Sequence, residues 1–546
     1  MSKRRRDKPQ PAQQLVDMAD LEDIVARARK APLSAEDSTT LLTTFQTLAF
    51  LQQELKAKGV TLERLRHILF GAQTEKTSAV LEKSKGESGS EEKGEKKPKR
   101  PGHGRNPASA YTGAAKVTVP HLGLTAGQPC AECLTGKVYP LEEPARLVRL
   151  TGMAPLAATV YECDRLRCNL CGEVFTAPAP EGVGDEKYNE TATAMTGLLK
   201  YGTGVPFNRL EKLQAGMGIP LPAATQWELV RDGAELLLPA HEELMREAAQ
   251  GKVLYNDDTT MKVLALSAAQ RAAAAADEET DGRTGVFTSG IVATNEGRYM
   301  ALFFTGSQHA GENLADVLTR RAAELPAPIQ MCDALSRNTS GDFKTLVANC
   351  IAHSRRKYVE VAAEFPDECR FVLETLGAVY CTDALARERG LNPEERLHLH
   401  QSESGPLMLA LDAWLRQQLD ERKVEPNSGL GEAIRYMRKH WPKLTLFLQQ
   451  PGAPLDNNTC ERALKKAILH RKNSLFYRSQ LGARVGDVFM SLIHTAELCE
   501  VAPFDYLVAL LRNHQSVAAT PAAWMPWSYQ ATLAALRPVA VPAPQL

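Results

Sequence analysis

The chain has 546 residues, of which 44% are hydrophobic and 24% charged, so it exceeds the size of one ordinary core and predicts several folded domains. Basic and acidic residues number 65 each, which excludes a strongly basic or strongly acidic protein and leaves only local patches to attract nucleic acid. No apolar run reaches the roughly 20 residues that span a bilayer, and the first residues lack an apolar signal core. We therefore expect a cytoplasmic protein with no membrane partner.

Leucines in the N-terminal region recur every seven residues. The series comprises Leu41, Leu48, Leu55, Leu62 and Leu69. This heptad pattern predicts a helical, coiled-coil segment that self-associates, although an amphipathic helix packed on its own domain explains it equally well, and Gly59 favours that alternative. Residues 83–110 are rich in Lys, Glu, Gly, Ser and Pro, a composition that predicts a basic, flexible linker.

Two Cys-x-x-Cys pairs flank a β-like stretch at residues 145–161. The four cysteines are Cys130, Cys133, Cys168 and Cys171. Thiolate pairs at strand ends can close a tetrahedral Zn²⁺ site, so this region predicts a zinc-ribbon-like module in which the metal has a structural role. Incidental cysteines are the alternative, and the spare thiol of Cys163 complicates the count. The ligands alone do not establish that the module contacts DNA.

Residues 186–250 are expected to form helices. The turn at 217–220, followed by polar residues at 225–226, is compatible with a helix-turn-helix that binds DNA. Plain helical packing, with Leu210 and Val230 in the core, is the simpler alternative.

Three acids in the C-terminal half are placed at element boundaries. Asp257 and Asp333 each close a short apolar run that predicts a strand, and Glu461 lies at the basic start of a predicted helix. The order of strand, strand, strand, helix, strand is that of an RNase H-like core. Its elements are expected near residues 253–257, 286–293, 299–304, 312–324 and 328–332. Carboxylates arranged in this way suit Mg²⁺ and predict phosphodiester cleavage or transfer.

Each acid also has a structural explanation. The two aspartates could initiate turns, and Glu461 has the spacing of a capping box with Asn458. Adjacent residues of a strand point to opposite faces, so only one of Asp257 and Asp258 can face a metal.

Several segments carry recognisable motifs. They are RHILFGAQTEK at 66–76, NDDT at 256–259, CIAHSRRK at 350–357, DNNTCERAL at 456–464 and RKN at 471–473. Together with the cysteine pairs, they resemble the signature segments of the insertion sequence 66 (IS66) family of bacterial transposases over nearly the whole chain. The chain departs from the pattern at Thr260, where many relatives have Pro, and at 334–336, where an aromatic residue is usual. The second departure makes Asp342 a rival to Asp333.

The resemblance implies a nucleoid-associated transposase of the Asp-Asp-Glu type, in which Asp257, Asp333 and Glu461 hold two Mg²⁺ ions, with Mn²⁺ as an alternative. It implies hydrolysis and strand transfer on double-stranded DNA at element ends and target, a homo-oligomer of at least two copies, and accessory proteins of the same element. Basic side chains expected to contact DNA are His353, Arg355, Arg356, Arg462, Lys465, Arg471 and Lys472. The rival functions are a catalytically inactive, zinc-containing DNA-binding protein derived from a transposase, and another RNase H-like nuclease.

The expected architecture is a multidomain α+β protein with an RNase H-like α/β catalytic core that a large helical insertion interrupts. The N-terminal half is divided into residues 1–82 (helical, with heptads), 83–110 (linker), 111–185 (zinc-ribbon-like module) and 186–250 (helical). The C-terminal half is divided into residues 251–345 (first part of the core), 346–450 (insertion), 451–515 (remainder of the core) and 516–546 (tail).

Overall fold

The computed structural model describes part of the chain. The described residues are 34, 37–41, 109, 116–119, 123–132, 135–139, 141, 147–148, 153–167, 169, 171, 173–184, 186–267, 285–341 and 343–536. The chain divides into two compact units, Met1–Lys83 and Ser84–Leu546. The predicted heptads beyond Leu41 and nearly all of the predicted linker lie outside the described residues, so the coiled coil stays a prediction.

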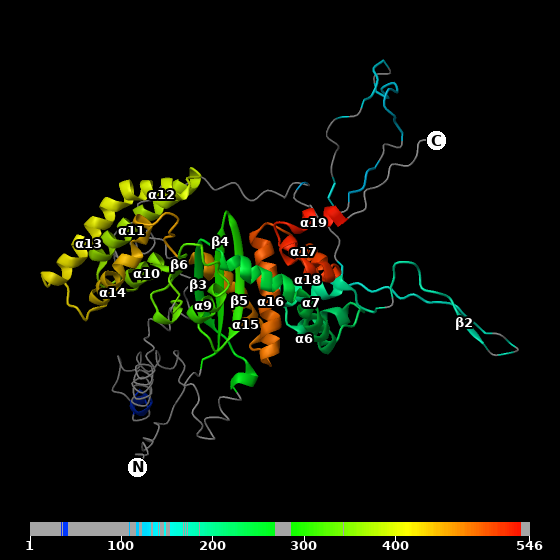
Figure 1. The fold of residues 1–546 in the computed structure, drawn as a ribbon, viewed down its shortest axis with the longest axis horizontal. Helices are drawn as coiled ribbons and strands as arrows, with labels where there is room; N and C mark the ends of the chain where they lie inside the picture. Colours follow the sequence, from blue (N-terminus) through cyan, green and yellow to red (C-terminus); the bar gives the residue numbers. More distant parts are fainter. Residues whose placement is uncertain are drawn as a thin grey trace, which may run out of the picture. The chain divides into compact units, whose positions relative to one another are not determined.

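A five-stranded mixed sheet lies at the centre of the second unit (Figure 1). Its strands are β3 (Val253–Thr260), β4 (Phe287–Asn295), β5 (Arg298–Gly306), β6 (Ile329–Cys332) and β7 (Leu346–Asn349). The spatial order is β5-β4-β3-β6-β7. The pairs β3–β4 and β4–β5 are antiparallel, whereas β3–β6 and β6–β7 are parallel. The β4–β5 turn contains Glu296 and Gly297, both at positive φ, which is the backbone that a two-residue hairpin turn requires.

Helices cover both faces of the sheet. On one face, α15 (Asn458–Ser474) packs against β3 and β4, whereas α16 (Gln480–Leu498) lies along the edge of the sheet at β5, where its side chains accept hydrogen bonds from β5 backbone amides. On the other face lies α9 (Ala310–Leu318), whose Asn313 donates to the Ser289 hydroxyl of β4 over 2.8 Å. Most central strand residues are buried, which explains why β4 and β5 are apolar along much of their length.

Further helices extend the same hydrophobic core. They are α5 (Glu190–Gly197), α6 (Phe207–Gly216), α7 (Ala223–Ala249), α17 (Pro503–Arg512), α18 (His514–Ala519) and α19 (Tyr529–Leu536). The helices predicted within 186–250 therefore form, and residues from α5, α7, α16 and α17 pack in one cluster with the sheet. In the proposed helix-turn-helix, Gln226 is fully buried and donates to the carbonyls of Phe207 and Leu221, which favours the packing alternative at this position.

The helical insertion follows β7. It consists of α10 (Ile351–Val361), α11 (Pro366–Glu388), α12 (Pro393–Leu399), α13 (Gly405–Asp420) and α14 (Gly429–Leu444). Its two ends meet, because the Ile351 amide donates to the Leu455 carbonyl over 3.0 Å. The chain thus returns to the core beside the point where it left, and then enters α15.

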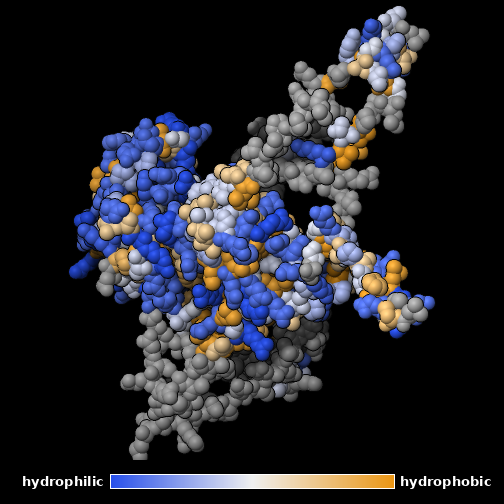
Figure 2. Space-filling view, turned by 45° about the vertical axis from the view of Figure 1, so that its right-hand side comes forward, coloured by the Kyte–Doolittle hydropathy of each residue, from blue (hydrophilic) through white to orange (hydrophobic). Residues whose placement is uncertain are grey.

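Among its described residues, the region of the predicted zinc module contains two short antiparallel pairings. One is the bridge between Pro129 and Lys137, and the other joins β1 (Arg165–Arg167) to β2 (Val174–Thr176). Cys130 and Cys171 are described, but Cys133 and Cys168 lie outside the described residues, so the four-cysteine site stays a prediction. The hairpin exposes the apolar side chains of Leu166, Val174 and Phe175, and Figure 2 shows hydrophobic patches on the projecting part of the chain as well as across the body of the molecule. Across the part of the chain that the structure describes, no helix has the length and apolarity to traverse a membrane.

Candidate active site

Asp257 lies within β3, on the face covered by α15. Its cross-strand partner is Gly290, and a Cβ added to that glycine would lie 2.9 Å from Leu464 Cδ2 of α15. Helix and sheet therefore approach so closely that only glycine fits without displacement. The buried Asn457, which precedes α15, fixes the start of the helix by donating from Nδ2 to the Asn256 carbonyl over 3.1 Å. This packing carries Glu461, in the first turn of α15, towards β3.

Asp333 directly follows β6, as predicted, and Asn338 connects it to Asp257. The Nδ2 of Asn338 donates to Asp333 Oδ1 over 2.6 Å and approaches Asp257 Oδ1 at 3.4 Å. Asp333 Oδ1 also accepts a hydrogen bond from the Leu335 amide over 3.0 Å. Asp333 therefore initiates a turn, as the structural explanation predicted, and also lies near Asp257. The rival residue Asp342 lies outside the described residues.

The electrostatics of Asp257 indicate a crowded acidic site. Burial, followed by the negative charges of Asp333, Asp258 and Glu461, raises the pKa of the Asp257 carboxyl to about 7, and a hydrogen bond from the Asp258 amide opposes this shift. A desolvated carboxyl among other acids is unfavourable when ionised, and a bound cation would relieve that cost.

Asp258 points to the opposite face of the sheet. Its Oδ2 lies 2.9 Å from His309 Nδ1, and its Oδ1 lies 3.6 Å from Arg337 Nη2. His309 and Arg337 also line a cleft of about 650 Å³ beside α9, away from α15. Of the two adjacent aspartates, Asp257 is therefore the one that faces the helix of Glu461.

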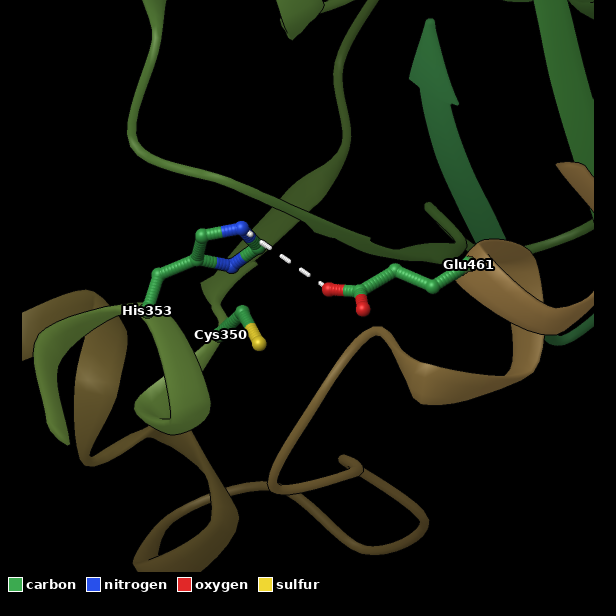
Figure 3. A group of neighbouring side chains, drawn as sticks. All are labelled: Cys350, His353 and Glu461. Atoms are coloured by element: carbon green, nitrogen blue, oxygen red, sulfur yellow. Dashed lines mark ion pairs between the residues drawn. The ribbon is translucent and has the colours of Figure 1, made fainter. Parts of the chain in front are cut away.

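Glu461 faces the start of α10 (Figure 3). Its Oε1 lies 3.7 Å from His353 Nε2, and Cys350 completes a group whose potential ligand atoms all lie within 4.8 Å of one another. The N-cap residue of α15, Asn457, makes no capping hydrogen bond with its side chain, and the Asn458 amide donates to Asp456 Oδ1 over 3.1 Å, so the capping-box explanation of Glu461 receives no support. Next to this group is a hollow of about 250 Å³. Its lining includes Asp333, His353, Arg356, Lys357 and Tyr436.

The basic residues predicted to contact DNA lie on α10 and α15. Arg356, Arg462, Lys465 and Lys472 are exposed, and His353 and Arg355 are partly buried. Arg471 has a different setting, because its Nη1 donates to the hydroxyls of Thr259 and Thr260 over 3.1 and 2.7 Å and so joins α15 to the end of β3.

Sequence reasoning missed Asn338 and Tyr436 as members of this site. Asn338 follows Asp333 by five residues, but no motif marked it, and only the fold-back of the 336–340 turn onto β3 brings it between the two aspartates. Tyr436 comes from α14 of the insertion and packs under the Lys357 ammonium, 4.7 Å from the ring centroid.

Comparison with known proteins identifies the family. The family model described as "Transposase IS66 family" matches residues 187–485, more than half of the chain and all three of the acids above. The chain belongs to the IS66 family of transposases.

Relatives of this IS66 protein occur in Sinorhizobium fredii (strain NBRC 101917 / NGR234). "Uncharacterized protein y4jD" is 28% identical over 67% of this chain and 71% of its own length. "Uncharacterized protein y4hP" and "Uncharacterized protein y4qI" are each 27% identical, over 64% and 62% of this chain. These two alignments span 63% and 62% of the relatives, less than two thirds of their length. Membership in the IS66 family supports a transposase-type role, with DNA as partner and a divalent metal as cofactor.

Proposed function

We propose that this chain is a DNA transposase of the Asp-Asp-Glu type, with Asp257, Asp333 and Glu461 as its catalytic carboxylates. The observation that carries the proposal is the convergence of the two aspartates on Asn338, on the sheet face against which the helix of Glu461 packs. The charges of Asp333 and Glu461, from two distant segments of the chain, both act on the desolvated carboxyl of Asp257, which supports the proposal. Such clusters of perturbed acids are typical of functional sites.

We further propose that the sheet and its helices form an RNase H-like core. The order β5-β4-β3-β6-β7 supports this assignment, with two antiparallel pairings on one side of β3 and two parallel pairings on the other. The insertion between β7 and α15 then separates the second aspartate from the glutamate.

The donor set suits hard divalent cations. Asp257, Asp333 and Glu461 offer carboxylate oxygens, which Mg²⁺ and Mn²⁺ prefer, and a bound cation would offset the burial that raises the pKa of Asp257. A pair of such ions would stabilise the attacking and leaving oxygens of a displacement at phosphorus. Asn338 would keep the two aspartates oriented, and the hollow lined by His353, Arg356 and Lys357 would receive a phosphate of the DNA backbone.

The remaining assignments follow from this role. Arg355, Arg462, Lys465 and Lys472 on α10 and α15 would contact DNA phosphates, and Arg471 would hold the end of β3. The four-cysteine module would bind structural Zn²⁺. Joining two element ends to a target requires at least a dimer, and the protein would act in the cytoplasm at the nucleoid, with accessory proteins of the same element.

The decisive experiment compares neighbouring aspartates. Asp257→Asn, Asp333→Asn and Glu461→Gln should each lower Mg²⁺-dependent cleavage of an element end by at least about a thousandfold while DNA binding is retained. Asp258→Asn is the matched control: the same chemical change one residue away, on the other face of the sheet, should leave cleavage within about tenfold of wild type.

The outcomes separate the candidate functions. Full cleavage by Asp257→Asn would refute the assignment. Stoichiometric DNA binding without any metal-dependent product in the wild type would select the inactive, DNA-binding derivative. Cutting of branched DNA without strand transfer would select a different nuclease.

A further inference from the structure

Cys350, His353 and Glu461 form a cluster that the carboxylate mechanism does not explain. Their sulfur, nitrogen and oxygen ligand atoms lie within 4.8 Å of one another (Figure 3). A purely oxygen-liganded magnesium site has no use for a thiol or an imidazole. The combination of one Cys, one His and one carboxylate is instead typical of ligands for a softer ion such as Zn²⁺.

The distances are close to those of a metal site. Ligands of a tetrahedral Zn²⁺ ion are separated by roughly 3.3–3.6 Å, given metal–ligand lengths of about 2.0–2.3 Å. His353 Nε2 and Glu461 Oε1 are already 3.7 Å apart. Both side chains are partly exposed, with 26% and 32% of the side-chain surface accessible, so small rotations can close the remaining gap. Three protein ligands would leave a fourth position open to water.

The surroundings of Cys350 favour a thiolate once a cation is present. Cys350 precedes the first turn of α10, and its Sγ accepts a hydrogen bond from the Asn457 amide over 3.3 Å. Burial raises the pKa of the free thiol to about 11, while backbone amides of Asn457, His353 and Ala352 oppose that shift. A cation bound at this sulfur would displace the thiol proton to solvent.

The imidazole also lacks a complete set of partners. His353 Nδ1 is buried and has no hydrogen-bond partner among the described residues. Its other nitrogen faces Glu461, and its ring lines the hollow that Asp333 also lines. The cluster is therefore reachable from solvent beside the carboxylates.

We propose that Cys350, His353 and Glu461 form a binding site for a thiophilic divalent ion, Zn²⁺ or Co²⁺, and that its occupancy withdraws Glu461 from the Mg²⁺-binding carboxylates. The inhibitory part rests on the proposed function; the binding part does not. Because one carboxylate serves both sites, the softer ion and the catalytic ions compete. Zn²⁺ then inhibits the Mg²⁺-dependent reaction, because Glu461 cannot bind Zn²⁺ with Cys350 and His353 and Mg²⁺ with the two aspartates at the same time.

The test uses Co²⁺ as a spectroscopic probe in the full chain without DNA. A thiolate bound to Co²⁺ gives a sulfur-to-metal charge-transfer absorption, whereas carboxylate and imidazole ligands do not. Co²⁺ titration of the wild type should show one more thiolate-bound ion per chain than titration of Cys350→Ser or His353→Gln. Cys381→Ser, at an exposed cysteine of α11, should match the wild type, and so should Asp257→Asn.

The predicted four-cysteine module also contributes a cobalt signal, so the difference between wild type and Cys350→Ser is the quantity to measure. No difference would overturn the proposal. An unchanged signal in Glu461→Gln would overturn the shared use of the carboxylate. A wild-type protein that binds more cobalt than both Cys350→Ser and Glu461→Gln and yet never cleaves DNA would support the metal site and refute the proposed transposase chemistry.

The competition has its own measurement. In wild type, the Zn²⁺ concentration that halves Mg²⁺-dependent cleavage should be at least about tenfold lower than in Cys350→Ser, since loss of one ligand weakens zinc binding. Cys381→Ser is again the matched control. Equal zinc sensitivity of Cys350→Ser and wild type would overturn the inhibitory role.

Discussion

Asn338 donates a 2.6 Å hydrogen bond to Asp333 and lies 3.4 Å from Asp257 through the same Nδ2. One neutral amide thus stands between two carboxylates that repel each other. Its backbone carbonyl is separately anchored by Asn256 and Gln330, over 2.8 and 2.7 Å. The side chain can therefore be removed while the turn that carries it keeps its main-chain anchors.

We predict that Asn338→Ala lowers Mg²⁺-dependent cleavage by about 10–100-fold, because residues that orient metal ligands have effects of this size. Metal affinity, measured by calorimetry, should fall in parallel while the circular dichroism spectrum stays that of the wild type. Ser336→Ala, at an exposed position of the same turn, is the control and should change neither quantity. Wild-type metal affinity in Asn338→Ala would contradict the orienting role.

The contact between Gly290 and Leu464 gives a second prediction. An added Cβ would lie 2.9 and 3.0 Å from two Leu464 carbons, so Gly290→Ala should push α15 from the sheet and cost about 1–3 kcal/mol of stability. Because Glu461 moves with α15, cleavage should fall by about tenfold or more. Chemical denaturation and cleavage rates measure the two effects.

Two variants control this experiment. Gly306→Ala adds the same methyl group where no atom lies within 4 Å, and should leave both stability and cleavage nearly unchanged. The double variant Gly290→Ala/Leu464→Ala removes the clash and should recover part of the activity lost by Gly290→Ala. Failure of the second change to restore any activity would show that helix displacement is not the cause.

The ion pair between Arg396 and Asp383 gives a third prediction. Arg396 Nη2 lies 2.6 Å from Asp383 Oδ1, and its Nη1 donates to the Ala453 carbonyl over 2.8 Å, which ties α12 to the segment before α15. Removing one partner of a largely buried pair costs roughly 3–5 kcal/mol, so Arg396→Met should destabilise the chain by about that amount. Arg387→Met removes a 70% exposed partner of the same carboxylate and should cost at most about 1 kcal/mol.

Low pH should reduce the contribution of the Arg396–Asp383 ion pair to the free energy of unfolding. Burial works against ionisation of Asp383, but hydrogen bonds with His400 and Arg396 and the charge of Arg396 outweigh it and lower the pKa to about 2. A depressed carboxyl pKa stabilises the folded state above the unfolded pKa of 3.8, and this stabilisation is lost as pH falls towards about 2. The free-energy difference between wild type and Arg396→Met should therefore shrink below about pH 4.

For Asp487 we predict the opposite pH dependence of stability. Burial raises the pKa of this α16 carboxyl to about 8, against hydrogen bonds from the Thr305 amide and hydroxyl, each 2.7 Å long. The folded state holds the proton more tightly than the unfolded state, so the contribution to stability falls as pH rises from 3.8 through about 8.

Asp487→Asn cannot ionise, so its unfolding free energy relative to wild type should rise between pH 5 and about pH 8 and level off at higher pH. Denaturant titrations at several pH values in the absence of metal measure this difference. The pKa of Asp257 is also raised, but Asp257 is present in both proteins, so its contribution cancels in the difference between them. A difference that is constant with pH would contradict the assignment of a protonated, buried Asp487.

Local pattern predicted the sheet well where the strands are apolar. The runs at 286–293 and 299–304 and the intervening turn correspond to β4 and β5, because burial on both faces selects continuous hydrophobic stretches. The predicted end of the first strand at Asp257 was wrong: β3 continues to Thr260, since Asp257 through Thr260 pair with β4 despite their polarity. Tertiary pairing overrides strand propensity there.

Other parts of the site depend on long-range packing that no local pattern contains. The sequence brought out Asp333 because it closes a short apolar run, and Glu461 because it lies at a predicted helix start within a recognisable motif. It could not choose between Asp257 and Asp258 on physical grounds, since that choice depends on which face α15 covers. The four-residue strand β7 was missed for a similar reason, because its parallel pairing to β6 is stabilised by neighbours rather than by its own residues.

The meeting of Ile351 and Leu455 at the base of the insertion has an engineering consequence. The insertion leaves and rejoins the core at one place and also packs against the sheet where α14 meets β7, so the turn between α13 and α14 can be changed while these contacts are kept. The exposed turn at residues 421–423, between α13 and α14, is therefore a suitable place for a fluorescent tag or for new chain ends. Such a handle would report on assembly of the protein with DNA from a position separated in sequence from Asp257, Asp333 and Glu461.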